Sequence, residues 1–160
     1  MDNVFSMKKN TITPLKEIIS CVEENLINGK WQVAIEIWAM SIEPLDFIRW
    51  LAKAIAPSVS TEFSELLNNI MMWRDHDDEL RREIYTKSEE LGFTTQAGAL
   101  GLALFMSGGS MSLPEYDPIN APEEAIKQIL HAILINQLVI TSDTPAEAVK
   151  MLFQKWCCSH

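Results

Sequence analysis

Apolar residues recur at intervals of three and four along almost the whole chain, and this helical periodicity constrains the fold more than any other feature. The first such stretch begins at Thr13 and ends at Gly29, a residue that readily adopts the left-handed conformation of a helix stop. Its apolar face comprises Leu15, Ile18, Ile19, Val22 and Leu26. No segment stands out with the alternating pattern of a strand. The sequence therefore predicts an all-α fold, a single-domain bundle of about seven to eight short helices over residues 13–160, after a flexible N-terminus at 1–12.

A helix rich in small residues is predicted at 96–106, with Thr94 or Thr95 as its cap. Gly98 and Gly101 lie in its interior, where a glycine costs about 1 kcal/mol relative to alanine. Such a cost indicates that another backbone approaches closely. We therefore expect this helix to form the buried centre of the domain.

A long irregular segment at 105–122 separates two strongly apolar helical stretches. Long loops inside compact domains are uncommon and are usually functional or disordered. Apolar and aromatic side chains within the loop, which a solvated linker does not need, favour a contact role. Trp73, at the end of a Met-Met-Trp run, is a further candidate because Trp and Met are common at protein-binding surfaces. The predicted protein-binding residues are Trp73, Ser107, Gly108, Gly109, Ser110, Leu113, Pro114, Tyr116 and Ile119.

The formal net charge of −9 limits the classes of partner. Nucleic-acid binding relies on Lys and Arg, and the sequence shows no basic stripe, so we expect neither nucleic acid nor an anionic membrane as partner. No uninterrupted apolar run reaches the roughly 18 residues of a membrane span. Residues 1–5 do not resemble a secretory signal. Three cysteines, Cys21, Cys157 and Cys158, do not form a disulfide framework, which indicates a reducing compartment, and we expect the cytoplasm.

Four short motifs suggest chemistry but are better explained structurally. Residues 75–78 (Asp-His-Asp-Asp) suit a helix N-terminus, where acidic side chains accept from free N–H groups and oppose the positive end of the dipole. Adjacent residues on one helix turn point in different directions, so few of them can reach one metal ion. The tail Cys157-Cys158-Ser159-His160 offers too few ligands for zinc. His131 has no nucleophile at a recognisable spacing. The Ser-Gly-Gly-Ser run at 107–110 follows a helix and lacks the lysine of a phosphate loop, so we interpret it as a helix stop. We expect no metal and no cofactor.

The order of several motifs resembles an uncharacterised family of small helical proteins, chiefly from proteobacteria. Its features are a helical segment with spaced Ala, Leu and Trp, a Trp before a charged turn with paired Arg, an alanine-rich helix, and Phe-x-Ser-Gly-Gly-Ser followed by prolines. The matching residues are Trp31 to Trp50 with Ala34, Ala39 and Leu45, Trp73, Arg81, Arg82, Ala97 to Phe105, Ser107 to Ser110, Pro114, Pro118 and Pro122. Departures from the pattern are Met106 in place of an aromatic residue, fewer loop prolines, and one Trp instead of two in the helix predicted at 45–55. The resemblance implies genes often adjacent to type VI secretion genes, hence an accessory, adaptor or chaperone-like role.

The sequence thus favours a non-enzymatic protein that binds a secretion component or an effector. One alternative is an immunity protein whose acidic surface neutralises a cationic toxin. Another is a small enzyme acting through His131 or residues 75–78. Formation of a homodimer is a further alternative.

Overall fold

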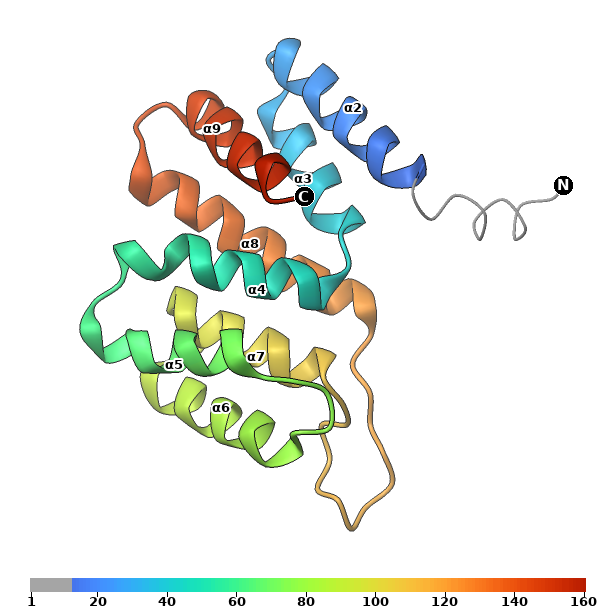
Figure 1. The fold of residues 1–160 in the computed structure, drawn as a ribbon, viewed down its shortest axis with the longest axis vertical. Coiled ribbons are helices and arrows are strands. Elements are labelled where there is room, and N and C mark those ends of the chain that lie inside the picture. The colour runs from blue at the N-terminus through green and yellow to red at the C-terminus, as the bar shows by residue number, and fades with distance from the viewer. Residues whose placement is uncertain (1–12) are drawn as a thin grey trace, which may run out of the picture. The chain divides into compact units, whose positions relative to one another are not determined.

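The computed structural model describes residues 13–160, and the regular elements in that part of the chain are all helices (Figure 1). The all-α prediction is therefore confirmed. The predicted flexible segment at 1–12 lies outside the described residues. The elements are α2 (Thr13–Ile27), α3 (Trp31–Ser41), α4 (Pro44–Ile55), the 3₁₀ turn η1 (Ala56–Ser58), α5 (Thr61–Met72), α6 (Asp78–Leu91), α7 (Gln96–Ser107), α8 (Glu123–Thr141) and α9 (Pro145–Cys158).

The described chain divides into two compact units. Residues 13–41 and 138–160 belong to the first unit, and residues 42–137 to the second. Helix α8 starts in the second unit and its last residues belong to the first.

The first unit has an aromatic core. The ring of Trp38 on α3 meets the edge of Phe153 on α9 at a centroid distance of 5.0 Å, and Trp156 lies 5.9 Å from Trp38. All three side chains are almost fully buried. Aromatic pairs at such distances stabilise a core by roughly 0.5–1.5 kcal/mol beyond the burial of their area. These rings thus hold α3 and α9 together.

The second unit is built from α4, α5, α6 and α7 with most of α8. Helix α4 buries one face because its apolar residues recur at helical spacing. The buried residues of that face are Phe47, Ile48, Leu51, Ala52 and Ile55. Each large side chain buried in this way contributes roughly 1.5–3 kcal/mol of hydrophobic stabilisation. Helix α7 packs against α4, α5 and α6, so it occupies the centre of this unit, as the sequence predicts.

Two glycines allow α7 to approach α6 closely. A Cβ atom at Gly101 would lie 1.8 Å from the hydroxyl oxygen of Ser88, and one at Gly98 would lie 1.9 Å from the carbonyl oxygen of Gly92. Neither distance is sterically possible, so only glycine fits at these two positions. The prediction of a close backbone approach is confirmed at Gly98, whereas the close neighbours of Gly101 are the side chains of Ser88 and Ile84.

Helix ends follow the expected chemistry. Gly29 and Gly92 both have positive φ, +77° and +106°, and end α2 and α6; the stop at Gly29 confirms the prediction from the sequence. The Thr95 hydroxyl accepts a hydrogen bond from the backbone N–H of Gly98 and caps α7. At the start of α6, an Asp77 carboxylate oxygen accepts a hydrogen bond from the Leu80 N–H. The interpretation of residues 75–78 as a helix N-terminus is therefore confirmed.

Across residues 13–160, no single helix is both long enough and apolar enough to cross a membrane. The bent pair α8–α9 is long and apolar enough when its two helices are counted together, by length and composition only.

Candidate functional site

Hydrogen bonds close the segment between α7 and α8 into a loop that extends beyond the helix ends of the second unit (Figure 1). The Met111 N–H donates to the Ile119 carbonyl at 2.7 Å, and the Ile119 N–H donates to the Ser110 hydroxyl at 2.9 Å. Farther out, the Ser112 hydroxyl donates to the Asp117 carbonyl at 2.7 Å. Three hydrogen bonds between the two limbs therefore give the loop a defined conformation of the Ω type.

The outer part of the loop presents apolar side chains to solvent. Leu113 is 52% exposed, Tyr116 is 65% exposed and Ile119 is 56% exposed. Pro114 is also exposed. We call residues 113–119 the tip. Exposed apolar groups gathered on one ordered loop are typical of a contact surface.

The inner part of the loop rests on Arg81, a side chain from α6 that is 2% exposed. Its guanidinium donates hydrogen bonds to the carbonyl oxygens of Phe105, at 2.7 Å, and Ser110, at 3.0 Å. The Phe105 ring lies beneath the guanidinium, with its centroid 4.7 Å from Cζ. One buried cation thereby joins the end of α7 to the start of the loop. We call Trp73, Asp78, Arg81, Arg82 and residues 105–112 the foot.

Asp78 connects both arginines of the foot. Its Oδ1 accepts hydrogen bonds from Nε and Nη2 of Arg81, and its Oδ2 accepts one from Nε of Arg82 at 2.9 Å. Arg82 in turn donates to the Ser112 carbonyl at 2.7 Å. The hydrogen bonds from Arg82 and then Arg81 hold the pKa of the Asp78 carboxyl below its ordinary value. The carboxylate is therefore ionised at neutral pH and orients both cations.

The glycines of the Ser-Gly-Gly-Ser run leave room for this foot. A Cβ at Gly108 would lie 2.8 Å from Cδ of Arg81 and 3.0 Å from two ring carbons of Trp73. A Cβ at Gly109 would lie 3.1 Å from the Arg81 guanidinium carbon. Gly108 has φ of −89°, so it is needed for space and not for a left-handed turn. The interpretation as a helix stop holds, since α7 ends at Ser107.

Trp73 was predicted as a contact residue, but the structure buries it. Its side chain is 1% exposed, and its Nε1–H donates to the Asp77 carbonyl at 2.9 Å. Its ring packs against Gly108. Burying the large apolar surface of the indole is favourable, and this explains why the side chain turns inward although it lies at a helix end. As placed here Trp73 presents no surface to a partner, and the prediction of direct contact is corrected to a supporting role.

The other predicted contact residues divide between the two parts of the loop. Four of them, Ser107, Gly108, Gly109 and Ser110, are half-buried in the foot. The remaining four form the exposed tip: Leu113, Pro114, Tyr116 and Ile119.

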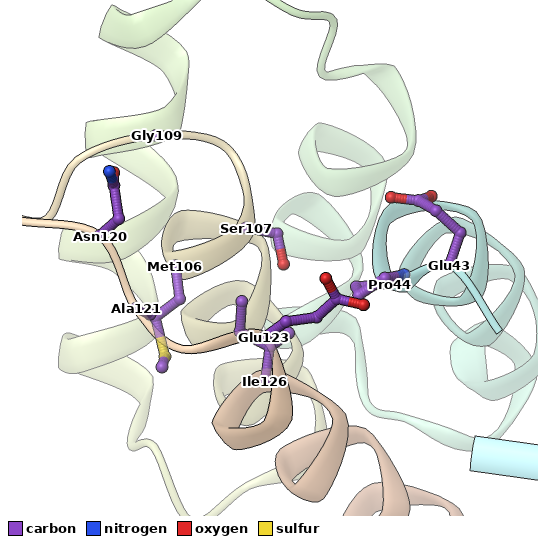
Figure 2. Close-up of a pocket in the computed structure, with 9 residues that line it drawn as sticks. All are labelled: Glu43, Pro44, Met106, Ser107, Gly109, Asn120, Ala121, Glu123 and Ile126. Carbon is purple, nitrogen blue, oxygen red and sulfur yellow. The ribbon is translucent and has the colours of Figure 1, made fainter. Parts of the chain in front are cut away.

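A cleft of about 250 Å³ lies at the base of the loop, between its two limbs and the start of α4 (Figure 2). Glu43 and Glu123 contribute carboxylates to it, and Figure 2 shows the Glu123 carboxylate between Ser107 and Pro44. Both carboxylates already have partners: Glu43 accepts from the Asp46 N–H, and Glu123 pairs with Lys127 at 2.9 Å. The cleft is therefore acidic but internally stabilised.

The remaining candidate motifs are dispersed. Within residues 13–160, no group of three or more His, Cys, Asp or Glu side chains could hold a metal ion. His131 lies half-buried on α8 and does not line the cleft of Figure 2. At the C-terminal tail, burial, together with the nearby Glu23 carboxylate, raises the pKa of the Cys157 thiol. A raised pKa disfavours the reactive thiolate.

Sequence reasoning missed the central role of Arg81. The paired arginines were noted only as part of a motif order, and no local pattern indicated that one of them is buried. The sequence does contain a Trp, paired Arg residues and a Gly-Gly dipeptide, and their joint occurrence is the only sign of the foot. In the structure these residues pack together as one unit.

These features define the class: an all-α protein that displays a hydrogen-bonded loop with an apolar tip. The chain belongs to the family of unknown function DUF6931, whose model matches residues 21–155. Comparison with curated proteins and with solved structures finds no match. The family match covers both the foot and the tip.

Proposed function

We propose that this protein is a non-enzymatic interaction module that binds another protein through the tip of the loop. The observation that supports the proposal is the combination of a foot built on buried side chains with a tip of exposed apolar ones. A loop held in its binding conformation loses little conformational entropy on association, which favours affinity. The side chains that we assign to the contact are Leu113, Tyr116 and Ile119.

The biological setting that we propose is bacterial secretion. The resemblance described above implies an accessory, adaptor or chaperone-like role beside a type VI secretion system, acting in the cytoplasm. A secretion component or an effector is then the partner. This part of the proposal depends on the resemblance and not on the geometry of the loop.

Affinity purification from the native host tests the proposal directly. The tagged wild-type chain is compared with a tip variant in which Leu113, Tyr116 and Ile119 are replaced by serine. A matched control replaces three exposed apolar residues outside the loop, Ile27, Val139 and Met151, by serine. We expect one protein to co-purify at near-stoichiometric yield with the wild type and the control but not with the tip variant. Equal recovery with all three chains would contradict the proposal.

An immunity protein is the second candidate, favoured by the net charge of −9. In that case the partner is a cationic toxin bound one to one, and deletion of the gene is toxic to the host. Viability of the deletion strain, together with the absence of a neighbouring toxin gene, would exclude this candidate.

A further inference from the structure

The loop between α7 and α8 carries only negative charges. Residues 107–126 contain four acidic side chains and no Lys or Arg. Two of the four, Glu115 and Asp117, are exposed and alternate with the apolar side chains of the tip. The tip therefore combines apolar and negative groups.

The nearest cations do not neutralise the tip, because the foot engages them. Arg81 is buried, and its donors are directed to Asp78 and to backbone carbonyls. Arg82 is 26% exposed on its side chain and binds Asp78 and the Ser112 carbonyl. One carboxylate, Asp78, already compensates part of this positive charge. The surface offered to a partner is therefore negative around its apolar centre.

The same sign continues at the base of the loop. The cleft of Figure 2 is lined by Glu43 and Glu123 and by residues from both limbs of the loop, Gly109 and Asn120 (Figure 2). Carboxylates thus lie at the base of the loop as well as at its tip, although at the base Lys127 already pairs with Glu123.

We infer that the partner is a protein with an apolar pocket that accepts the tip and a rim of Lys and Arg that faces Glu115 and Asp117. This inference rests on the proposed function and adds the chemistry of the partner to it. Complementary charge at a rim chiefly accelerates association and excludes wrong partners, while the apolar centre supplies most of the affinity. An anionic lipid surface is disfavoured because it would repel the same carboxylates.

A cross-linking experiment identifies the partner. A photo-reactive phenylalanine analogue replaces Tyr116 in the native host, and the cross-linked peptide is sequenced. The purified partner then binds the wild-type chain and two variants, Glu115→Gln/Asp117→Asn and Glu115→Lys/Asp117→Lys. The matched control reverses two exposed charges outside the loop, Glu24→Lys/Glu36→Lys. Circular dichroism verifies that each variant is folded.

If the inference holds, the cross-linked site adjoins Lys or Arg residues of the partner. Neutralising the two tip carboxylates lowers the affinity about fivefold at low salt, and reversing them lowers it more than tenfold, mainly through the association rate. The control variant binds as the wild type does. Salt weakens wild-type binding and narrows the difference between the variants.

Other outcomes separate the inference from the proposed function. Loss of binding in the Leu113, Tyr116 and Ile119 serine variant, with no effect of charge reversal, would overturn the inference and leave the proposed function standing. A cross-link to a second copy of this chain, or binding to vesicles of phosphatidylglycerol in place of a protein, would overturn the inference. Absence of any cross-link, with undiminished binding by the serine variant, would overturn both.

Discussion

The foot and the tip share the loop between α7 and α8, but different forces determine their residues. At the foot, a buried guanidinium, an indole and two glycines fill one another's space, and backbone carbonyls are hydrogen-bonded to charged donors. At the tip, apolar side chains are exposed and do not contribute to the core. Changes at the foot should therefore reduce stability, whereas changes at the tip should leave stability unaltered and affect binding.

This difference shows that an unusual sequence motif can be explained either by packing or by binding. The Ser-Gly-Gly-Ser run is constrained by the packing of Arg81 and Trp73, so its residue types are explained without any ligand. The residues at 113–119 have no comparable structural explanation for their apolar character, because burial does not stabilise them. Binding, as proposed above, would account for the apolar residues of the tip, whereas packing accounts for those of the foot.

The largest expected effect comes from comparing two aromatic residues that the sequence places in one contact surface. Trp73→Ala removes a buried indole and its hydrogen bond, and it should lower the free energy of unfolding by about 3–5 kcal/mol. Tyr116→Ala should change it by no more than about 0.5 kcal/mol. Urea denaturation measures both. Equal effects of the two substitutions would remove the distinction between foot and tip.

Arg81→Ala should have the next largest effect, because it removes the donor to Oδ1 of Asp78 and to the Phe105 carbonyl, and the shorter of the two hydrogen bonds to the Ser110 carbonyl. We expect a loss of about 2–4 kcal/mol and faster hydrogen exchange at the Met111 amide, which closes the loop. The matched control is Arg74→Ala, an exposed arginine that also donates to backbone carbonyls. It should cost less than about 1 kcal/mol. Unchanged exchange at Met111 in the Arg81 variant would show that the loop does not depend on the foot.

Gly108→Ala tests the space argument with a single methyl group. The new Cβ would lie 2.8 Å from Cδ of Arg81, which is held in place by its hydrogen bonds, so we expect a loss of about 1–3 kcal/mol from overpacking. Gly109→Ala meets its nearest atoms at 3.1 Å and should cost less. Thermal denaturation ranks the two variants. The reverse order would show that the close contacts with Arg81 and Trp73 do not limit the site.

Local features of the fold could be predicted from the sequence because local chemistry determines them. Helical periodicity, the glycine stop at Gly29, the Thr95 cap and the close packing at Gly98 and Gly101 all depend on residues near in sequence or on steric limits. The exposure of Leu113 and Tyr116 in a long loop also follows from their turn-rich surroundings.

The foot could not be predicted because it depends on contacts between residues far apart in the chain. Trp73 and Gly108 are separated by a whole helical hairpin, and no local pattern reveals that their side chains meet. Arginine is also rarely buried, so burial of Arg81 contradicts the ordinary expectation for its type. The error at Trp73 has the same origin, since a Trp beside a charged turn gives no sign of what covers it.

Asp78 gives the smallest expected effect and a pH dependence whose sign is fixed. Its pKa is lower in the folded chain than in the unfolded one, so its contribution to stability is complete above about pH 4–5 and is lost as the pH falls through the folded value. Because the side chain is 52% exposed, Asp78→Asn should cost only about 1 kcal/mol at neutral pH. The difference between the variant and the wild type should disappear in acid, whereas Asp75→Asn, an exposed change in the same turn, should have little effect. Urea denaturation across the acid range measures this, and a difference that persists at low pH would mean that the Asp78 carboxylate does not hold the two arginines.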